Sequence, residues 1–167
     1  MKNLITLLLV VFSLTLSNEL SAQKFGYVNT QELLQTLPAV KEANVNIDTY
    51  RNQLLKKGQE MLKGLQGKYQ NLEQTRDNYS PVQLEAEVAK LKAEEQKIME
   101  FEQSSQQQIF DKSEVLLKPI RDKIQKAIDD VATENGYTYI FDFSTGFVLY
   151  ADQSSDVGAL VKAKLGI

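Results

Sequence analysis

Residues 78–83 read Asn78-Tyr79-Ser80-Pro81-Val82-Gln83, and they interrupt an otherwise continuous helical pattern. A serine before a proline is typical of a helix start, because serine caps the free backbone N–H groups and proline suits the first helical position. Gln83 follows Ser80 at the spacing of a capping box. This stretch predicts a tight turn between two helices, and so short a connection makes them antiparallel.

On both sides of this turn, apolar residues repeat in steps of four and three, the spacing of a coiled-coil seam. The repeat contains Leu54, Met61, Leu65, Leu72 and Tyr79 before the turn, and Leu84, Val88, Leu91, Ile98, Ile109 and Leu116 after it. Pro38 suits the start of the first helix, and Asn135-Gly136 suits the end of the second. The pattern predicts a two-helix arm over residues 46–116 that has no globular core.

The residues outside the arm predict short strands and short helices. Lys24 to Val28 is strand-like, and Asn29 or Thr30 can cap a helix through Leu37. Residues 137–143 and 147–150 read as the two strands of a hairpin around Ser144-Thr145-Gly146. Ser154 or Ser155 can cap a last helix, whose apolar face would comprise Val157, Leu160, Val161 and Leu165.

The fold class expected from these elements is α+β and mainly α, with a long helical hairpin projecting from a small β-sheet body. The body comprises residues 23–45 and 117–167. So small a sheet has open edges and too little core in one chain, which predicts an oligomer that closes the sheet between copies. The side chains expected at this contact are Tyr27, Tyr139, Phe141, Phe147 and Leu149.

Residues 1–22 have the three-part layout of a secretory signal peptide. Lys2 gives a positive start, residues 4–16 are mainly apolar, and Ser21-Ala22 supplies small residues for cleavage near Ala22. The apolar run is short for a membrane span, although a retained anchor is the alternative. No later segment has the apolar length of a span, so we expect a soluble, exported chain.

The composition argues against an enzyme. The chain has no Cys and no His, which excludes a Ser-His triad, a Cys-His pair and the usual zinc sites. The adjacent carboxylates Glu94-Glu95 and Asp129-Asp130 point about 100° apart on a helix, so neither makes a catalytic pair alone. The net charge is −3, which does not favour nucleic acid. We expect no catalytic residues, no metal and no cofactor.

The order of these segments resembles the Skp/OmpH family of periplasmic chaperones. The resemblance rests on Gly26-Tyr27-Val28-Asn29, Leu33-Leu34 and Pro38 before the hairpin, and on Tyr139-Ile140-Phe141-Asp142, Val148-Leu149-Tyr150, Asp156-Val157, Val161 and Leu165 after it. It implies a jellyfish-like homotrimer in the periplasm, whose three arms enclose a cavity. Unfolded outer-membrane proteins would be held in that cavity without ATP. A structural coiled-coil protein or adaptor of the envelope is the alternative.

The charge of the arm departs from this family, whose well-studied members are strongly basic. Residues 45–116 contain 10 basic and 12 acidic side chains. This balance argues against attraction to lipopolysaccharide or to an anionic membrane, and it predicts weak electrostatic steering of clients.

Several apolar arm residues lie beside the strict seam. They are Leu55, Leu62 and Tyr69 on the first helix and Met99, Phe101 and Phe110 on the second. One interpretation is a lining that binds clients, to which methionine would contribute an adaptable surface. The other is a wider contact between the two helices, which we favour for Leu62 and Phe101; for Tyr69 and Met99 both remain open.

A hinge is predicted within the arm. Gly58 would lie opposite Glu102 and Ser105 in an antiparallel pair, so the seam lacks apolar residues on both helices at this level. Gly58, Gly64 and Gly67 each weaken the helix by about 1 kcal/mol relative to alanine. Pro119 can add a kink near the root of the second helix. The alternative is that these are merely tolerated exposed positions.

Overall fold

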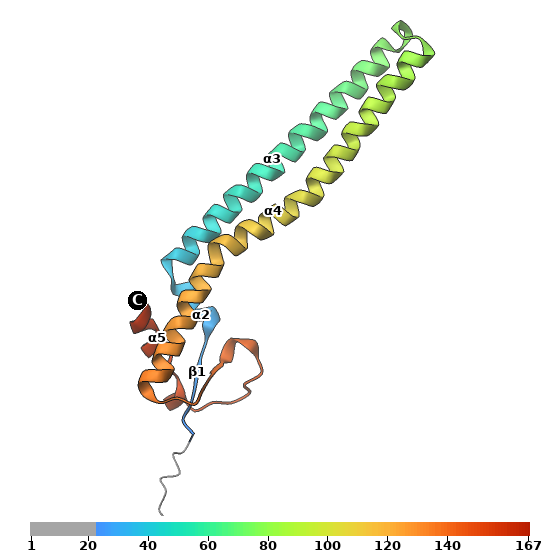
Figure 1. The fold of residues 1–167 in the computed structure, drawn as a ribbon. Coiled ribbons are helices and arrows are strands. Elements are labelled where there is room, and N and C mark those ends of the chain that lie inside the picture. Colours follow the sequence, from blue (N-terminus) through green and yellow to red (C-terminus); the bar gives the residue numbers. More distant parts are fainter. Residues whose placement is uncertain (1–22) are drawn as a thin grey trace, which may run out of the picture.

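The computed structural model describes residues 23–167, and the predicted signal peptide lies outside the described residues. Two long helices form most of the fold: α3 (Pro38–Thr75) and α4 (Pro81–Asn135). Figure 1 shows them side by side as an arm that rises from a small body. The predicted mainly helical α+β class, with its antiparallel hairpin, is therefore confirmed.

The turn between the helices has the predicted capping box. The Ser80 hydroxyl accepts a hydrogen bond from the Gln83 N–H at 3.4 Å, and the Ser80 N–H donates to Gln83 Oε1 at 2.9 Å. A short 3₁₀ helix, η1 (Arg76–Asn78), completes the connection. At the other end, α4 stops at Gly136, which has φ 69° and donates its N–H to the Ala132 carbonyl. Glycine takes this left-handed conformation without steric cost.

The body is built where the two ends of the chain meet. Strand β1 (Phe25–Val28) leads through helix α2 (Thr30–Thr36) into the arm, and strand β2 (Tyr139–Asp142) follows it. The strands pair in parallel, with Phe25 opposite Tyr139 and Val28 opposite Asp142. One face of this sheet contributes Val28 and Ile140 to the body core, while the other face is left outside it.

The body core is a compact apolar cluster drawn from both ends of the chain. Its buried members are Val28, Leu33, Leu37, Ile124, Ala127, Val131, Val157, Val161 and Leu165. Gly26 lies at its edge, where a Cβ atom would approach Val157 Cγ1 to 3.0 Å and the Tyr137 ring to 3.1 Å. Glycine is therefore needed for this close approach of β1 to the C-terminal segment.

A second, separate cluster holds the outer part of the arm together. Leu65, Leu91 and Ile98 are buried there, with Met61 and Leu72 packed against them. The apolar core of the molecule is thus divided into a body part and an arm part. The proposed boundaries of the arm, residues 46 and 116, stay a prediction.

The predicted β-hairpin is wrong for the single chain. After β2 the chain forms a short 3₁₀ helix, η2 (Phe143–Thr145), and residues 147–150 pair with no strand of the described part of the chain. An extended segment becomes a strand only when another backbone satisfies its N–H and C=O groups. Within one chain, residues 147–150 have no such neighbour.

The last helix, α5 (Gly158–Leu165), begins later than predicted. Residues 153–155 form a short 3₁₀ helix, η3 (Gln153–Ser155), so neither Ser154 nor Ser155 caps α5. The carboxylate of Asp156 accepts the Gly158 N–H at 2.7 Å instead. Val157, Val161 and Leu165 are buried as predicted, but Leu160 is exposed.

Candidate functional site

An aromatic surface covers the face of the sheet that points away from the body core. Phe25 stacks on Tyr139 with ring centroids 5.8 Å apart, and Tyr139 stacks on Phe141 at 6.2 Å. Beside them, the Tyr27 ring lies 5.2 Å from Phe143. Tyr139 is 55% exposed and Phe141 46% exposed, although rings of this size normally bury most of their surface.

The unpaired segment 147–150 carries the most exposed large apolar side chains of the described chain. Phe147 is 89% exposed and Leu149 is 94% exposed, and Tyr150 is similarly open. An extended segment with free backbone groups and uncovered apolar side chains is a template for pairing with another chain. Four of the five side chains predicted at the contact between copies are thus uncovered, and the fifth, Tyr27, is half-buried.

Sequence analysis missed three members of these surfaces: Phe25, Phe143 and Tyr150. The alternation of strand residues gives a signal for Phe25, since it must share a face with Tyr27. Alternation gives a signal for Phe143 as well, since it lies two residues after Phe141 within the predicted strand 137–143. Tyr150 ends the predicted strand 147–150, and its exposure is visible only in the fold.

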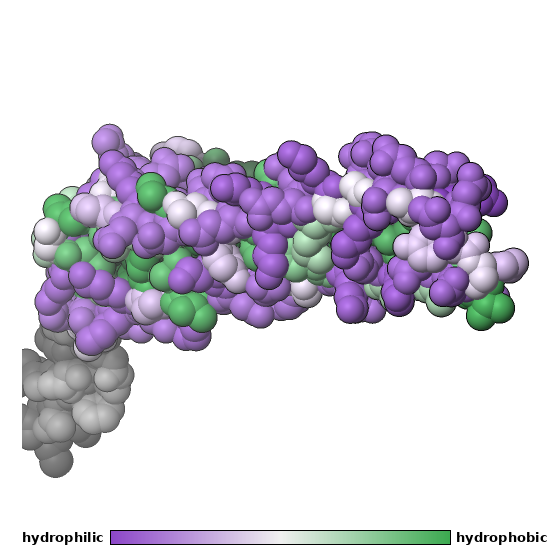
Figure 2. Space-filling model, turned by 90° about the horizontal axis from the view of Figure 1, so that it is seen from above, coloured by the Kyte–Doolittle hydropathy of each residue, from purple (hydrophilic) through white to green (hydrophobic). Residues whose placement is uncertain are grey.

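On the arm, five of the six predicted client-binding residues are exposed. These are Leu55, Leu62, Tyr69, Met99 and Phe110. Figure 2 shows a largely hydrophilic arm on which hydrophobic side chains surface as separate patches. Phe101 differs, because it is half-buried and packs against Gly58, while the Lys57 ammonium lies 5.1 Å from the centre of its ring. The exposed five are therefore available to a partner.

A groove opens between α3 and α4 at the level of Gly58. Its volume is about 470 Å³. It is lined by Arg51, Leu54, Leu55, Gly58, Gln59, Leu62, Phe101, Glu102, Ser105, Gln106 and Ile109. Three of the predicted client-binding residues and three of the four predicted hinge residues thus meet at one place. The structure does not bring Tyr69, Met99 or Phe110 into this groove.

The predicted hinge residues occupy two levels of the molecule. Gly58, Glu102 and Ser105 share the groove, and Ser105 is buried with its hydroxyl donating to the Phe101 carbonyl at 2.7 Å. Pro119 lies inside α4, further along the helix than the groove. Proline has no N–H to donate to the preceding turn, so a kink is expected at this residue. Whether the arm flexes at either level stays a prediction.

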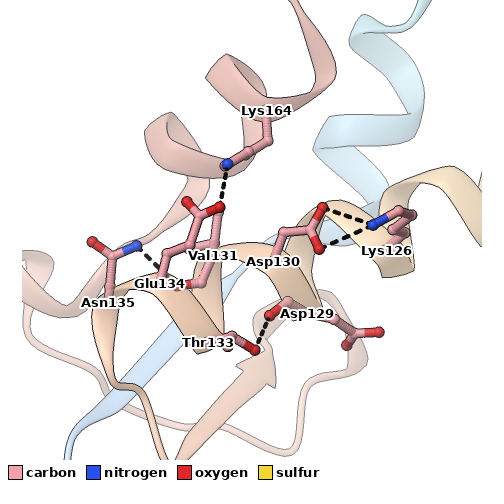
Figure 3. A network of polar contacts seen from close by, with 8 residues as sticks. All are labelled: Lys126, Asp129, Asp130, Val131, Thr133, Glu134, Asn135 and Lys164. Atoms are coloured by element: carbon pink, nitrogen blue, oxygen red, sulfur yellow. Dashed lines mark hydrogen bonds and ion pairs between the residues drawn. The ribbon is translucent and has the colours of Figure 1, made fainter.

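Several acidic side chains are engaged with a lysine or tyrosine of the same chain. At the root of α4, Lys126 bonds Asp130 at 3.0 Å, and Lys164 of α5 bonds Glu134 at 2.5 Å (Figure 3). On the arm, Lys68 pairs with Glu94. The Tyr69 hydroxyl donates to Glu95 at 3.0 Å, and this hydrogen bond raises the pKa of Tyr69.

In the adjacent pairs Glu94-Glu95 and Asp129-Asp130, the carboxylates of Glu94, Glu95 and Asp130 thus each contact a lysine or tyrosine side chain. Within residues 23–167, no three acidic, His or Cys side chains gather in a way that would hold a metal ion. No helix in the same range is both long and apolar enough to cross a membrane.

Asp142 ties the end of β2 to the start of α2. Its carboxylate accepts hydrogen bonds from the Thr30 hydroxyl at 2.6 Å, the Ser144 N–H at 2.9 Å and the Ser144 hydroxyl at 2.7 Å. Partial burial raises the pKa of Asp142, but these hydrogen bonds outweigh it and leave the pKa below its ordinary value. The residue therefore has a structural role in positioning the aromatic surface.

Asp142→Asn should destabilise the body by about 1.5–3 kcal/mol at neutral pH, the scale of hydrogen bonds to a charged group. Because the pKa is depressed on folding, this stability is present above the unfolded pKa of about 4 and is lost as the pH falls through the folded pKa. Urea unfolding should thus show a gap between parent and variant that closes in acid. Asp77→Asn, on the exposed η1 turn, is the control. A gap that stayed constant with pH would contradict this role.

Comparison with known proteins gives a family match and a fold match. The sequence model of the family described as "Outer membrane protein (OmpH-like)" matches residues 24–165. The crystal structure of a candidate outer membrane chaperone (OmpH-like) from Caulobacter crescentus superposes with a TM-score of 0.73. It is 15% identical in sequence, and the match covers 86% of this chain and 84% of that one. No curated protein sequence matches the chain.

Proposed function

Because the chain belongs to the OmpH-like family of outer membrane proteins, we propose that it is an ATP-independent holdase chaperone of the periplasm. The family supports a chaperone role in general. The finer proposal is that unfolded outer-membrane proteins are bound between helical arms and thereby kept from aggregating. No cofactor and no catalytic residue takes part.

One observation carries this proposal: the arm leaves apolar side chains uncovered along its length. Leu55, Leu62 and Tyr69 follow one another at seven-residue intervals on α3, a spacing of about 10 Å along a helix. Met99 and Phe110 add two more on α4. A passive spacer needs none of them, whereas a protein that holds unfolded chains needs accessible apolar surface that cannot collapse on itself.

We also propose that three copies assemble through the body. The exposed aromatic face of β1 and β2 and the unpaired segment 147–150 both support assembly. Joining them between copies would cover the apolar rings and satisfy the free backbone groups of the segment. A cyclic arrangement of this kind would direct all the arms to one side and enclose a cavity.

Dilution of a urea-unfolded β-barrel membrane protein into buffer, followed by light scattering, tests the holdase activity. The parent protein should suppress scattering without ATP when it is in modest excess over the client. A structural adaptor would leave the scattering curve unchanged, and that result would exclude the proposed function.

Client binding should depend only weakly on salt. Many arm charges already pair within the chain, as in Arg51 with Asp48 at 2.6 Å and Lys90 with Glu87 at 2.5 Å. Residues 45–116 also hold 10 basic and 12 acidic side chains, so the arm has little net charge to attract a client, and salt has little to screen. A tenfold rise in salt should change the Kd measured by fluorescence anisotropy by less than about threefold. A steep loss of affinity would show that a local basic patch dominates.

A further inference from the structure

The groove beside Gly58 has the outline of a socket for a side chain. Leu55, Gly58, Gln59 and Leu62 line it, and they stand at positions i, i+3, i+4 and i+7 of α3. Four residues at this spacing form the hole that receives a knob when helices pack. Leu55 is 59% exposed and Leu62 is 48% exposed, so both walls are uncovered. Because residue 58 has no side chain, the centre of the hole is hollow.

The floor of this socket is apolar and has no unmet polar group. Phe101 Cε1 lies 3.6 Å from the place that a Cβ atom on Gly58 would occupy. The one buried polar side chain nearby, Ser105, already donates its hydroxyl to a backbone carbonyl of its own helix. An apolar group entering here would therefore meet apolar atoms and displace no hydrogen bond.

Of the two charged residues that line the groove, Arg51 and Glu102, only Glu102 lacks an ion pair within residues 23–167. Arg51 also lines the groove, but its guanidinium is paired with Asp48. Glu102 is exposed and takes part in no ion pair within residues 23–167. A basic residue beside the bound group would be attracted to this carboxylate.

Along the line of Leu55 and Leu62, the next holes on α3 in both directions are filled, which argues for a single bound side chain rather than a docked helix. One heptad towards the tip, the hole between Leu62 and Tyr69 contains the buried Leu65. One heptad towards the body, the equivalent place is occupied by the Asp48–Arg51 ion pair. A helix from a second copy would need successive holes, whereas a flexible chain needs one.

We propose that this socket binds one large apolar side chain of an unfolded polypeptide, with a lysine or arginine of the same segment next to Glu102. The proposal rests on the holdase function and assigns it a binding site. Leu55, Leu62 and Phe101 contact the bound side chain, and Gly58 provides the space. The other exposed apolar residues of the arm add weaker, less defined contacts.

The absence of cysteine from the chain allows the socket to be probed directly. Gln59→Cys, labelled with a thiol-reactive benzophenone, places the probe in the socket. Gln53→Cys is the matched control, because Gln53 is exposed on the same helix but does not line the groove. On irradiation with an unfolded β-barrel protein bound, position 59 should give strong adducts and position 53 only background. Equal yields, or adducts between two copies without client, would overturn the proposal.

Filling the socket gives a second, independent test. Gly58→Leu fills the space beside residue 58. Gly67→Leu makes the same change on α3 outside this groove, at a position where an added Cβ atom would have no neighbour within 4 Å. The probe is a labelled twelve-residue peptide with one Phe beside one Lys. Gly58→Leu should raise its Kd about tenfold, or about 1.4 kcal/mol, the scale of burying one apolar side chain. Gly67→Leu should leave the Kd unchanged, and replacing the Phe by Ala should weaken binding to the parent as Gly58→Leu does.

The outcomes separate this site from the proposed function. If the parent protein fails to suppress aggregation, both the proposed holdase function and the proposed socket are refuted. If the parent suppresses aggregation but the Gly58→Leu variant binds the peptide as tightly as the parent does, only the proposed socket is refuted. Circular dichroism should show both leucine variants to be at least as helical as the parent, because leucine favours the helix over glycine and a Cβ atom at residue 58 makes only ordinary contacts.

Discussion

Tyr139→Asp should convert the assembled protein into single subunits that keep their helices. In one chain Tyr139 is 55% exposed, so an aspartate there is tolerated by the isolated subunit. In the proposed assembly the same position is covered, and an unpaired buried charge costs roughly 3–5 kcal/mol in each subunit. Size-exclusion chromatography with light scattering should therefore report the mass of a monomer, while far-UV circular dichroism remains close to that of the parent.

Two controls define this result. Tyr139→Phe keeps the ring and should leave the assembly intact. Val82→Asp adds the same charge at an apolar residue that is 76% exposed at the tip of the arm, where no contact between copies is proposed. A parent protein that is monomeric at micromolar concentration would refute assembly through the body, as would an unchanged mass for Tyr139→Asp.

Stiffening the arm at its interrupted seam should reduce protection of large clients. The combined change Gly58→Ala, Glu102→Leu and Ser105→Leu adds apolar contacts between α3 and α4 where the two apolar clusters are separated. The glycine change alone favours the helix by about 1 kcal/mol. We expect an unchanged oligomer, slower amide hydrogen exchange near residues 58 and 105, and weaker suppression of aggregation for the largest β-barrel proteins.

The size of the client distinguishes flexing of the arm from loss of the socket, since this variant alters both. Filling the socket weakens the binding of every client that uses it, including a twelve-residue peptide. A stiff arm weakens the binding only of those clients that are large enough to require a wider cavity. The ratio of large-client to peptide affinity, compared with that of Gly58→Leu, is therefore the relevant measurement. An equal loss for both classes of client would remove flexing from the mechanism.

The elements that could be predicted from the sequence depend on neighbours within a few residues or on a long repeat. Ser80 and Gln83 are three positions apart, so their capping box is a local property. The strand predicted at residues 147–150 does not form in the single chain, because a strand also needs a partner backbone, which a local pattern cannot supply. The start of α5 was misplaced for a related reason: Val157 donates its N–H to the carbonyl of Tyr27, a contact that no local pattern reveals.

The exposed surfaces were likewise predictable where they depend on the helical repeat, and not where they depend on contacts between the two helices. Exposure of Leu55 and Tyr69 agrees with their positions beside the seam, because the helical repeat determines which face each residue occupies. The sequence favours a wider helix contact for Phe101, but it does not identify Gly58 as the residue that Phe101 packs against, since this contact joins an off-seam residue of one helix to a missing side chain on the other. A repeat read along one helix at a time does not contain that contact.

The parallel pairing of Phe25 with Tyr139 determines the order in which the molecule can fold. The arm is a local structure, so α3 and α4 can pair progressively from their capped turn as soon as both have formed, and local contacts form quickly. Strand β1 comes first in the chain, yet its partner and the core residues Val157 and Val161 come last. Strand β1 must therefore wait for β2 and these core residues, and the aromatic rings that would recruit other copies are aligned only when those segments have been made.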